Sequence, residues 1–412
     1  MKKKILSMLL SMVLTVACFT GCGSNPSSGG ETGGAASTET PKNPEDMYTV
    51  TMAVIGNDQE DMDLVEAEMN KILAEKVGAQ IDVITLGWGV YQQQLQLMLS
   101  GAEKLDLVPI MYNNVSTYVN SGQVLDMSDL IDQYGVNMKA ALGEDILKIA
   151  NMNGYVYGVP VEKEWYADSC LVMRKDILDK YNLDVSNVKS LADCAPIFET
   201  IHENEPDMKI IVGAKDGLIG NIYFADVLSD RFGVLDNGGA DTTIVNYYET
   251  DNYKNLAATV HDYYEKGYID KDMATSTDAG TTTLKAGNAF CFATPYKPGV
   301  AEQESLNTGY ELVAVRINPT PAFCYTNAVA AITWGIGQNC ENPEMTMKVL
   351  DYMYGDPELM NLFNWGIEGV HYVIKDAEND VIGFPDGVDA SNAKYNLNMG
   401  WELPNQYKIH VW

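Results

Sequence analysis

The sequence of 412 residues predicts an α/β protein of two lobes that are joined by a hinge of several segments. Strand-like and helix-like patterns alternate from Tyr48 onward, which is typical of a largely parallel sheet with right-handed crossovers. The same alternation starts again at Ser190, which indicates a second sheet. Segments near residues 158, 296 and 364 are expected to carry the chain from one lobe to the other.

The first lobe is predicted to begin with a strand, a helix, a strand, a helix and a strand. In order, these elements are expected at 48–55, 64–77, 79–85, 91–99 and 105–111. Apolar residues spaced three and four apart predict the helices, and alternating apolar residues predict the strands. Ligands of such sheets bind beyond the carboxyl ends of the strands. The side chains expected there are Asn57, Asp58, Trp88, Tyr112, Asn113 and Asn114.

The stretch from Asn153 to Arg174 is expected to form the first crossover. Aromatic and β-branched residues alternate up to Pro160, which predicts a short strand at the edge or the end of a sheet. Carboxylates and large rings follow without a helical period, at Glu162, Glu164, Trp165 and Tyr166. A cleft that binds a polar, hydroxyl-rich ligand needs this mixture, whereas a purely structural connection does not.

The second lobe is predicted to follow this crossover. Its expected elements are a helix from Ser190, a strand at 209–212, a helix opened by the loop that contains Tyr223, a helix within 246–272 and a strand at 287–294. Pro295 to Gly299 form a stiff turn, which we expect to be the second crossover. Strands at 312–317 and 328–336, and helices that begin at Pro343 and Pro357, are assigned to the first lobe. The predicted division is 47–157 and 297–360 for the first lobe, and 158–296 and 361–412 for the second.

The N-terminus has the layout of an export signal. Lys2 to Lys4 precede an apolar run from Ile5 to Val16, which is too short to span a bilayer comfortably, and small residues and cysteines follow. Phe19-Thr20-Gly21-Cys22 resembles the bacterial lipobox, in which the cysteine is acylated and becomes the new N-terminus. Acylation of Cys18 and an ordinary cleaved signal peptide are the alternatives. We expect a lipoprotein signal peptide at 1–21 and acylation of Cys22.

Residues 22–46 are rich in Gly, Ser, Thr and Pro and contain almost no apolar residue, so they are expected to form a disordered tether. A tether of this length holds a folded body on the order of 27 Å from the lipid head groups. No later stretch is long and apolar enough for a transmembrane helix. The sequence therefore predicts a lipid-anchored protein on the extracellular face of the cell membrane.

The composition argues against some classes of binding partner. The chain has 57 acidic and 27 basic residues and a net charge of −30, which argues against nucleic acids and anionic lipids as partners. The five cysteines after Cys22 include no close pair, and Cys194 and Cys291 are expected to be buried core residues. The histidines lack metal-ligand spacing, and no phosphate loop or nucleophile motif occurs. We therefore expect neither a metal nor a cofactor.

Four motifs resemble extracellular solute-binding proteins of ABC sugar importers, the family that includes maltose-binding protein, and within it the lipoproteins of Gram-positive bacteria. They are Leu86-Gly87-Trp88-Gly89-Val90-Tyr91 before a QLQLMLSG helix, Gly158-Val159-Pro160 before the acidic aromatic run, Met173-Arg174-Lys175-Asp176, and Asn364-Trp365-Gly366-Ile367-Glu368-Gly369-Val370-His371-Tyr372. The resemblance covers about residues 1–385. It implies a two-lobed periplasmic-binding-protein-like fold that closes on a mono- or oligosaccharide and delivers it to a membrane permease.

The resemblance also implies a monomer without a cofactor. One departure concerns the C-terminus, because proteins of this family usually continue through further helices, whereas this chain stops at Trp412, soon after Trp401. Either the second lobe is closed differently or the chain is truncated. A surface sensor or adhesin that binds glycans without feeding a permease is an alternative that fits the same residues.

Sugars present apolar C–H faces and rings of hydroxyl groups, so aromatic platforms and paired hydrogen-bonding groups hold them. The expected platforms are Trp88, Trp165, Tyr296, Trp334 and Trp365. The expected polar anchors are Asn113, Glu164 and Glu368, with Glu162 and Tyr223 as further candidates. The alternative for each ring is core packing, and for each acid a solvated surface. The sequence does not fix the strand register that decides whether Glu162 or Glu164 faces the cleft.

Clustered acids and aromatic rings also occur in glycosidases. Glu162 and Glu164 are two residues apart, so on one strand their side chains would lie roughly 6.5 to 7 Å apart and point the same way. Glycoside hydrolysis needs its two carboxyl groups on opposite faces of the scissile bond, which neighbours on one strand cannot provide. We therefore expect a binding protein, with a glycoside hydrolase as the alternative.

Overall fold

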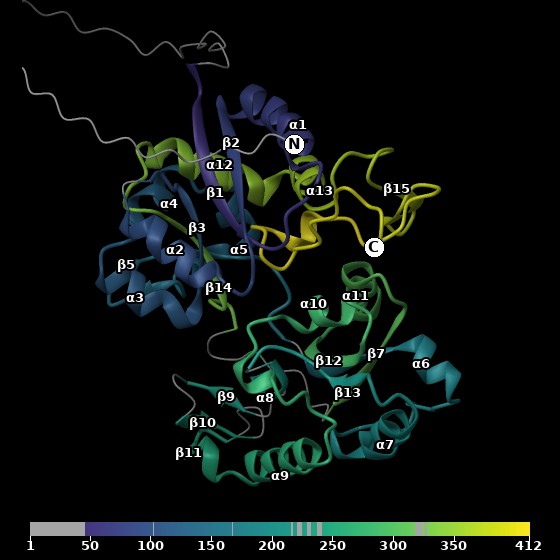
Figure 1. Ribbon diagram of the computed structural model, residues 1–412. Helices are drawn as coiled ribbons and strands as arrows, with labels where there is room; N and C mark the ends of the chain where they lie inside the picture. The colour runs from purple at the N-terminus through teal and green to yellow at the C-terminus, as the bar shows by residue number, and fades with distance from the viewer. Residues whose placement is uncertain are drawn as a thin grey trace, which may run out of the picture. The chain divides into compact units, whose positions relative to one another are not determined.

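The computed structural model describes residues 46–412 apart from several short gaps (Figure 1). The gaps are 102, 167, 216, 221–224, 229–231, 237–240, 318–323 and 325–327. The expected signal peptide, Cys22, the tether up to residue 45 and the candidate Tyr223 thus lie outside the described residues. Within the described part, no helix is both long enough and apolar enough to cross a membrane.

The first lobe is built on a sheet of five strands in the order β2-β1-β3-β14-β6. The strands are β1 (Tyr48–Ile55), β2 (Ala79–Leu86), β3 (Leu107–Met111), β6 (Val159–Pro160) and β14 (Ile332–Ile336). Strand β1 runs parallel to β2 and β3, and β14 is antiparallel to β3 and β6. The predicted alternation of parallel strands and crossover helices is therefore confirmed for this sheet.

Helices cover both faces of the first sheet. They are α1 (Met62–Lys76), α2 (Tyr91–Ser100), α3 (Val115–Asn120), α4 (Ser128–Tyr134), α5 (Val136–Leu147), α12 (Pro343–Gly355) and α13 (Pro357–Trp365). Val50, Met52 and Val54 of β1 point into one buried core together with α1 and α12. Ala53 points to the opposite face, where Leu95 of α2 packs. This period of two is the reason that β1 could be identified from its sequence.

The second lobe is built on a sheet of four strands in the order β13-β7-β12-β8. The strands are β7 (Asp168–Arg174), β8 (Lys209–Ile211), β12 (Ala289–Tyr296) and β13 (Leu312–Ile317). The helices of this lobe are α6 (Lys175–Lys180), α7 (Ala195–Asn204), α8 (Gly217–Gly220), α9 (Asp251–Glu265), α10 (Gly280–Lys285) and α11 (Val300–Thr308). The predicted buried positions of Cys194 and Cys291 are confirmed, because both lie in the core of this lobe.

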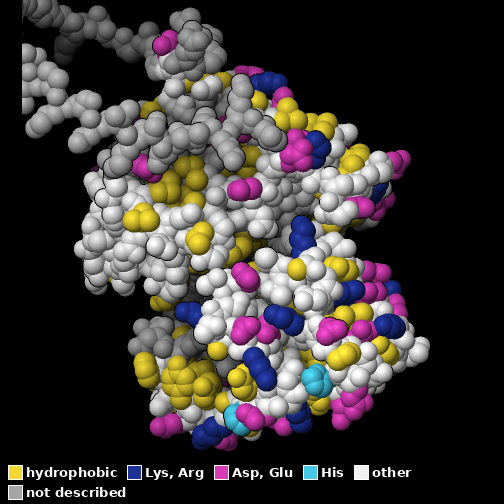
Figure 2. Space-filling view, viewed as in Figure 1, with side chains coloured by type: hydrophobic (Ala, Val, Ile, Leu, Met, Phe, Trp, Pro, Cys, Tyr) yellow, Lys and Arg dark blue, Asp and Glu magenta, His cyan; other side chains and the backbone are white. Residues whose placement is uncertain are grey.

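Smaller elements complete the fold. A satellite sheet consists of β9 (Asp226–Val227), β10 (Gly233–Leu235) and β11 (Ile244–Asn246), and two hairpins are formed by β4 (Asn151–Met152) with β5 (Tyr155–Val156) and by β15 (Val373–Asp376) with β16 (Val381–Gly383). Short 3₁₀ turns occur at Tyr112–Asn114, Ala192–Cys194, Tyr247–Glu249, Met273–Thr275 and Gln406–Lys408. Figure 2 shows acidic side chains spread over both lobes on the face in view.

Strand β13 lies in a different sheet from the one expected. The sequence analysis assigned 312–317 to the first lobe, but β13 pairs antiparallel with β7 from Leu312 opposite Arg174 to Ile317 opposite Ser169. The chain therefore leaves the second sheet after β13 and not at the turn near residue 296. The first crossover lies between β6 and β7, next to the predicted position near residue 158.

The C-terminal segment also lies on a different lobe from the one expected. Tyr395, Leu397 and Leu403 belong to the core of the first lobe, together with Phe363 of α13. No crossover therefore occurs near residue 364. Figure 1 shows the yellow C-terminal segment on the side of the first lobe that faces α10 and α11. Residues 395–405, which we call the C-terminal strap, thus reach the boundary between the lobes.

Candidate functional site

A cavity of approximately 1750 Å³ lies between the two lobes. The first lobe contributes the loops that follow β1, β2 and β3, and the C-terminal strap contributes residues 396–399 and Trp401. The second lobe contributes the start of α10, the end of β12 and one face of α11. The cavity thus lies beyond the carboxyl ends of parallel strands, which is where open α/β sheets bind ligands.

The loops of the first lobe bring several predicted residues together. Because β1, β2 and β3 are parallel, their carboxyl ends meet at one edge of the sheet. The residues of these loops that line the cavity include Asn57, Asp58, Trp88, Tyr112 and Asn113. Five of the six side chains expected at this edge thus line one cavity, whereas Asn114 is not among the lining residues, and the role of the five toward a ligand stays a prediction.

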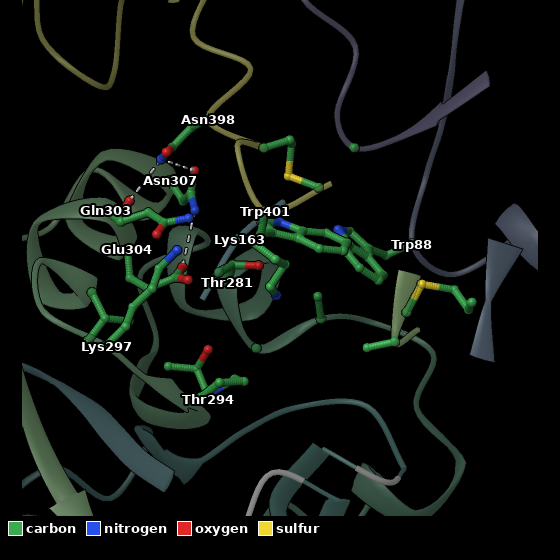
Figure 3. Close-up of a pocket in the computed structure, with 18 of the residues that line it drawn as sticks. Trp88, Lys163, Thr281, Thr294, Lys297, Gln303, Glu304, Asn307, Asn398 and Trp401 are labelled. Carbon is green, nitrogen blue, oxygen red and sulfur yellow. Dashed lines mark hydrogen bonds between the residues drawn. The ribbon is translucent and has the colours of Figure 1, made fainter. Parts of the chain in front are cut away.

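Two indole rings form a platform on the wall of the first lobe (Figure 3). The rings of Trp88 and Trp401 stack with their centroids 5.6 Å apart and their planes at 26°. Tyr91 meets Trp88 edge-on, with 5.8 Å between ring centroids. Trp88 is 40% exposed, so much of its ring surface remains open to a ligand. The ammonium group of Lys163 lies 5.9 Å from the ring centroid of Trp401.

Buried hydrogen bonds hold Trp401 in this wall. Its neighbour Glu402 is fully buried, and the Oε1 atom of Glu402 accepts a hydrogen bond of 2.8 Å from the backbone N–H of Ile55, the last residue of β1. The indole N–H of Trp334 donates to the backbone carbonyl of Glu402 at 2.8 Å. Asn364 Oδ1 accepts from the backbone N–H of Met399 at 2.9 Å. Burial raises the pKa of Glu402 well above its ordinary value.

The first crossover contributes Lys163, Glu164, Trp165 and Tyr166 to the cavity wall. Glu164 forms an ion pair with Lys297 of the second lobe, with 3.5 Å between Oε1 and Nζ. The buried Nε1 atom of Trp165 and the buried Oδ1 atom of Asn396 have no hydrogen-bond partner among the described residues. Buried polar groups usually have one, so both atoms are exceptions among the buried polar groups of the described residues.

Glu164 lines the cavity, whereas Glu162, two residues earlier in the crossover, does not. The backbone N–H of Glu162 donates to the carbonyl of Pro404 at 3.0 Å, and its carbonyl accepts from the N–H of Gln406 at 2.8 Å. Glu162 is absent from the residues that line the cavity. Partial burial raises the pKa of its carboxyl group. We therefore withdraw Glu162 as a ligand contact, because its backbone anchors the crossover to the C-terminal strap.

Two of the predicted aromatic platforms are core residues. Trp334 is fully buried in the core of the first lobe, so the prediction of a ligand platform is wrong at this position. Trp365 is 5% exposed, donates its indole N–H to the carbonyl of His410 at 3.1 Å and contacts Trp412. An apolar strand and an amphipathic helix carry these rings, and in both the aromatic residue fills the buried face.

Two further candidates lie away from the described cavity wall. The ring of Tyr296, at the end of β12, packs against the guanidinium group of Arg316 at 5.0 Å. Glu368 is exposed in the turn that closes on Tyr372. Neither residue is among those that line the cavity, so the structure does not bring them together with Trp88 and Glu164.

The wall of the second lobe is polar and was not identified from the sequence. Its side chains include Thr281, Thr294, Lys297, Gln303, Glu304 and Asn307. Glu304 is only 9% exposed, and its Oε2 atom accepts a hydrogen bond of 3.2 Å from Nδ2 of Asn307. Burial raises the pKa of Glu304. The available signal was the polar face of the helix that follows the stiff turn at Pro298 and Gly299.

Metal chemistry has no visible basis in the described part of the chain, where no group of three or more His, Cys, Asp or Glu side chains could hold an ion. Burial raises the pKa of the Cys170 and Cys194 thiols to about 12, so these two cysteines are poor nucleophiles. What the cavity offers is stacking surface, hydrogen-bonding groups and a few charges.

Comparisons with known proteins identify a family and several relatives of this chain. Residues 56–359 match the family model described as bacterial extracellular solute-binding protein. A protein of Streptococcus pneumoniae serotype 4, named carbohydrate ABC transporter substrate-binding protein, is 28% identical over 369 residues, which make up 89% of this chain and 73% of that protein.

Solved structures with the same fold extend the comparison. The N-glycan transport solute binding protein from Streptococcus pneumoniae is 26% identical to this chain in its complex with Man1GlcNAc, with a TM-score of 0.75 and coverage of 88% of this chain and 79% of that one. Its complex with Man5GlcNAc gives the same identity and TM-score, with 88% and 78% covered. Because the family model matches more than half of the chain, this protein belongs to the bacterial extracellular solute-binding protein family.

Proposed function

We propose that this protein captures a carbohydrate between its two lobes and delivers it to the permease of an ABC importer. The observation that carries the proposal is the stacked pair of Trp88 and Trp401, which faces a wall of hydroxyl, amide and carboxyl groups across one cavity. A sugar offers an apolar C–H face to the rings and hydroxyl groups to the opposite wall. A purely apolar ligand would leave the polar wall unmatched.

The proposal assigns roles to four residues of the cavity wall. Trp88 and Trp401 stack against sugar rings, while Asn113 and Glu164 bind hydroxyl groups.

The size of the cavity favours a sugar of several units. Pockets for small molecules usually measure about 300–1000 Å³, and this cavity measures approximately 1750 Å³. The solved relative in complex with Man5GlcNAc supports the same class of ligand, because an oligosaccharide occupies that protein. We therefore propose an oligosaccharide, and we take Man1GlcNAc and Man5GlcNAc as the first compounds to test.

Delivery to a permease needs a ligand that favours the closed arrangement of the lobes. Such a ligand contacts both walls and so adds binding free energy only when the lobes are together. The first wall supplies the platform and the second supplies hydrogen-bonding groups, which gives a sugar that differential contact. The relative named as an ABC transporter substrate-binding protein supports transport as the purpose of this binding.

The carbohydrate assignment is tested with the purified body, residues 46–412, in thermal unfolding and calorimetry. We expect Man5GlcNAc or another oligosaccharide of a broad panel to raise the melting temperature, with about 2.7 kcal/mol added at 100 times Kd. A panel that leaves the melting temperature unchanged, while peptides raise it, would contradict the assignment. Cleavage products in the same mixtures would indicate a glycoside hydrolase instead.

We further propose that an acyl chain on Cys22 holds the protein at the outer face of the membrane. The apolar run of residues 5–16 and the lipobox-like sequence that ends at Cys22 support this anchor. We expect metabolic labelling with a fatty acid to mark the wild-type protein and to disappear in Cys22→Ala. Labelling that persists in Cys22→Ala and disappears in Cys18→Ala would assign the anchor to the other cysteine.

A further inference from the structure

Helix α11 presents three polar side chains at the boundary between the lobes. It belongs to the second lobe, because Val300 at its start packs in the same core as Cys170 and Phe292. Asn307 follows Gln303 by four residues and Glu304 by three, so its side chain neighbours both on the helix surface, and all three residues line the cavity. The polar face of α11 therefore forms the part of the second wall that lies nearest to the C-terminal strap.

Asn398 approaches this face from the first lobe. Its backbone N–H donates to the carbonyl of Asn364 at 3.3 Å, and its neighbours Leu397 and Met399 belong to the first core. Its side chain crosses the boundary, because Nδ2 donates to the carbonyl of Gln303 and to Oδ1 of Asn307, each at 3.3 Å (Figure 3). The amide of Asn398 therefore connects the two lobes.

The connection continues into the cavity. Oδ1 of Asn307 accepts from Asn398, and Nδ2 of the same amide donates to Oε2 of Glu304 at 3.2 Å. Both ends of the Asn307 amide are thus occupied, which fixes its orientation and the position of one carboxyl oxygen of Glu304. Glu304 is 9% exposed and lines the cavity. A rigid carboxyl group at the rim of a sugar site is a strong hydrogen-bond partner for hydroxyl groups.

A second contact shows that the lobes meet elsewhere in the same arrangement. A Cβ atom added at Gly89, in the loop that carries Trp88, would lie 3.4 Å from the carbonyl oxygen of Thr277 in the second lobe. The loop that carries Trp88 therefore also approaches the second lobe closely beside the cavity. The Asn398 bond is the contact that reaches a residue of the cavity wall through a chain of hydrogen bonds.

We propose that Asn398, Asn307 and Glu304 form a latch between the lobes that couples closure to the binding of the sugar. The proposal rests on the proposed function for the identity of the ligand. Glu304 binds a hydroxyl group of the sugar, and Asn398 is a positioning residue that orients Glu304 through Asn307 only when the lobes are together. Closure thus improves the site, which gives the ligand its preference for the closed state.

The backbone of Asn398 determines which substitutions are informative. Its φ is 51°, in the left-handed region that asparagine and glycine tolerate better than other residues. Asn398→Gly removes the amide without straining the backbone. Asn398→Asp keeps the shape but places a carboxylate opposite two acceptor oxygens, so it opposes closure. Asn182 has a φ of 52° and is exposed on the second lobe, so Asn182→Gly and Asn182→Asp are matched controls.

The first measurement needs no ligand. We expect small-angle X-ray scattering of the ligand-free body to shift to a larger radius of gyration in Asn398→Asp, and by less in Asn398→Gly. The Asn182 variants are expected to match the wild type. Circular dichroism checks that each variant is folded. If both Asn398 variants scatter like the wild type, the latch is overturned.

The second measurement tests the coupling with Man5GlcNAc as the ligand, by calorimetry. We expect Asn398→Gly to weaken binding about 5- to 10-fold and Glu304→Gln about 10-fold, in line with the loss of one or two hydrogen bonds. In the double variant, the fold-loss of affinity is expected to be smaller than the product of the two single fold-losses, because both substitutions act through the same carboxyl oxygen of Glu304. Independent effects that multiply would overturn the positioning role of Asn398.

The two measurements separate this inference from the proposed function. If Man5GlcNAc and every other saccharide of the panel fail to bind the wild type, the carbohydrate assignment fails, whereas the scattering of the ligand-free variants still decides the latch. If a saccharide binds and Glu304→Gln binds it as tightly as the wild type, Glu304 is not a ligand contact and the latch as proposed is wrong.

Discussion

The two walls of the cavity are built on different principles. The wall of the first lobe presents rings, and buried groups fix them, because Glu402 and Trp334 tie the strap that carries Trp401 to the core. The wall of the second lobe presents polar side chains from the short helix α11, from the end of β12 and from the start of α10. The difference indicates a stacking platform on one side and a set of hydrogen-bonding groups on the other.

This division has a physical reason. Stacking is tolerant of which sugar is bound, so a platform serves best when it is rigid. Hydrogen bonds select among hydroxyl groups and are gained only at short range, so a sugar held on the platform makes them to the opposite wall only when the lobes are together. On this view the first wall determines much of the affinity, and the second wall determines which sugar is retained.

The largest expected effect is on the core beneath the first wall. Trp334→Ala is predicted to lower the free energy of unfolding by about 3–5 kcal/mol, because it removes a large buried ring and leaves the carbonyl of Glu402 without its donor. Urea unfolding of the ligand-free body measures the change. Tyr407→Ala is the control, since Tyr407 is 66% exposed. A loss of sugar affinity in Trp334→Ala without any loss of stability would instead identify Trp334 as a platform.

The next effect concerns the platform itself. Trp401→Ala is predicted to weaken oligosaccharide binding roughly 10- to 100-fold, because stacked aromatic contacts act as hot spots in binding sites. A smaller loss of stability than in Trp334→Ala is expected, since the ring of Trp401 is only partly buried against the first core. Calorimetry with the saccharide that binds the wild type measures the affinity. Tyr407→Ala, an exposed ring near the same end of the chain, should bind like the wild type; equal losses in both variants would contradict the platform.

Much of this first wall was predictable from the sequence, and the part that was missed is instructive. The period of two in β1 and the loop around Trp88 identified the sheet and one ring of the platform, because local patterns determine local structure. Trp401 was missed, because alternating apolar residues show that a segment is buried but not which core receives it. The same limit explains why β13 was assigned to the wrong sheet.

Less of the second wall could be predicted from the sequence. Glu304 stands in a chain with 57 acidic residues, so nothing in its type distinguishes it from solvated acids. Only the three-dimensional position of α11, opposite Asn398, gives Gln303, Glu304 and Asn307 a shared site. The register of the first crossover is a similar case. The sequence ranked Glu164 ahead of Glu162 but did not fix which of them faces the cleft, and the pairing of the Glu162 backbone with the strap accounts for its position away from the cavity.

A smaller effect follows from the buried acid beneath the platform. The folded-state pKa of Glu402 is raised above 4.5, so the protonated form stabilises the fold. This contribution is complete below the unfolded pKa and is lost as the pH rises through the folded pKa, with at most about 1.4 kcal/mol per pH unit. Relative to Glu402→Gln, the wild type is therefore predicted to lose stability as the pH rises above 4.5.

Urea unfolding of both proteins from pH 4.5 upward measures this difference, and other titrating groups cancel in the comparison. Glu358→Gln, on the N-terminal turn of α13 and exposed, is the control and should follow the wild type. A stability difference between the wild type and Glu402→Gln that does not change with pH would show that Glu402 keeps the same protonation state when the chain unfolds.

The smallest predicted effect is on the ion pair between the walls. Glu164 and Lys297 are 3.5 Å apart, and their side chains are 28% and 22% exposed, so solvent screens the pair in part. Lys297→Met is predicted to change the free energy of unfolding by less than about 1 kcal/mol. Added salt should shrink the difference further, because screening weakens exposed charges. A double-variant cycle with Glu164→Gln isolates the interaction between the two side chains.

This ion pair also sharpens the contrast between the walls, since it joins the crossover to the second lobe and would part on opening. If it contributes to closure, its loss in Lys297→Met should enlarge the radius of gyration of the ligand-free body by less than Asn398→Asp does. A larger increase in the radius of gyration in Lys297→Met than in Asn398→Asp would show that the ion pair at the crossover contributes more to closure than the hydrogen bonds of Asn398. The Glu164–Lys297 pair would then be the main contact that holds the lobes together.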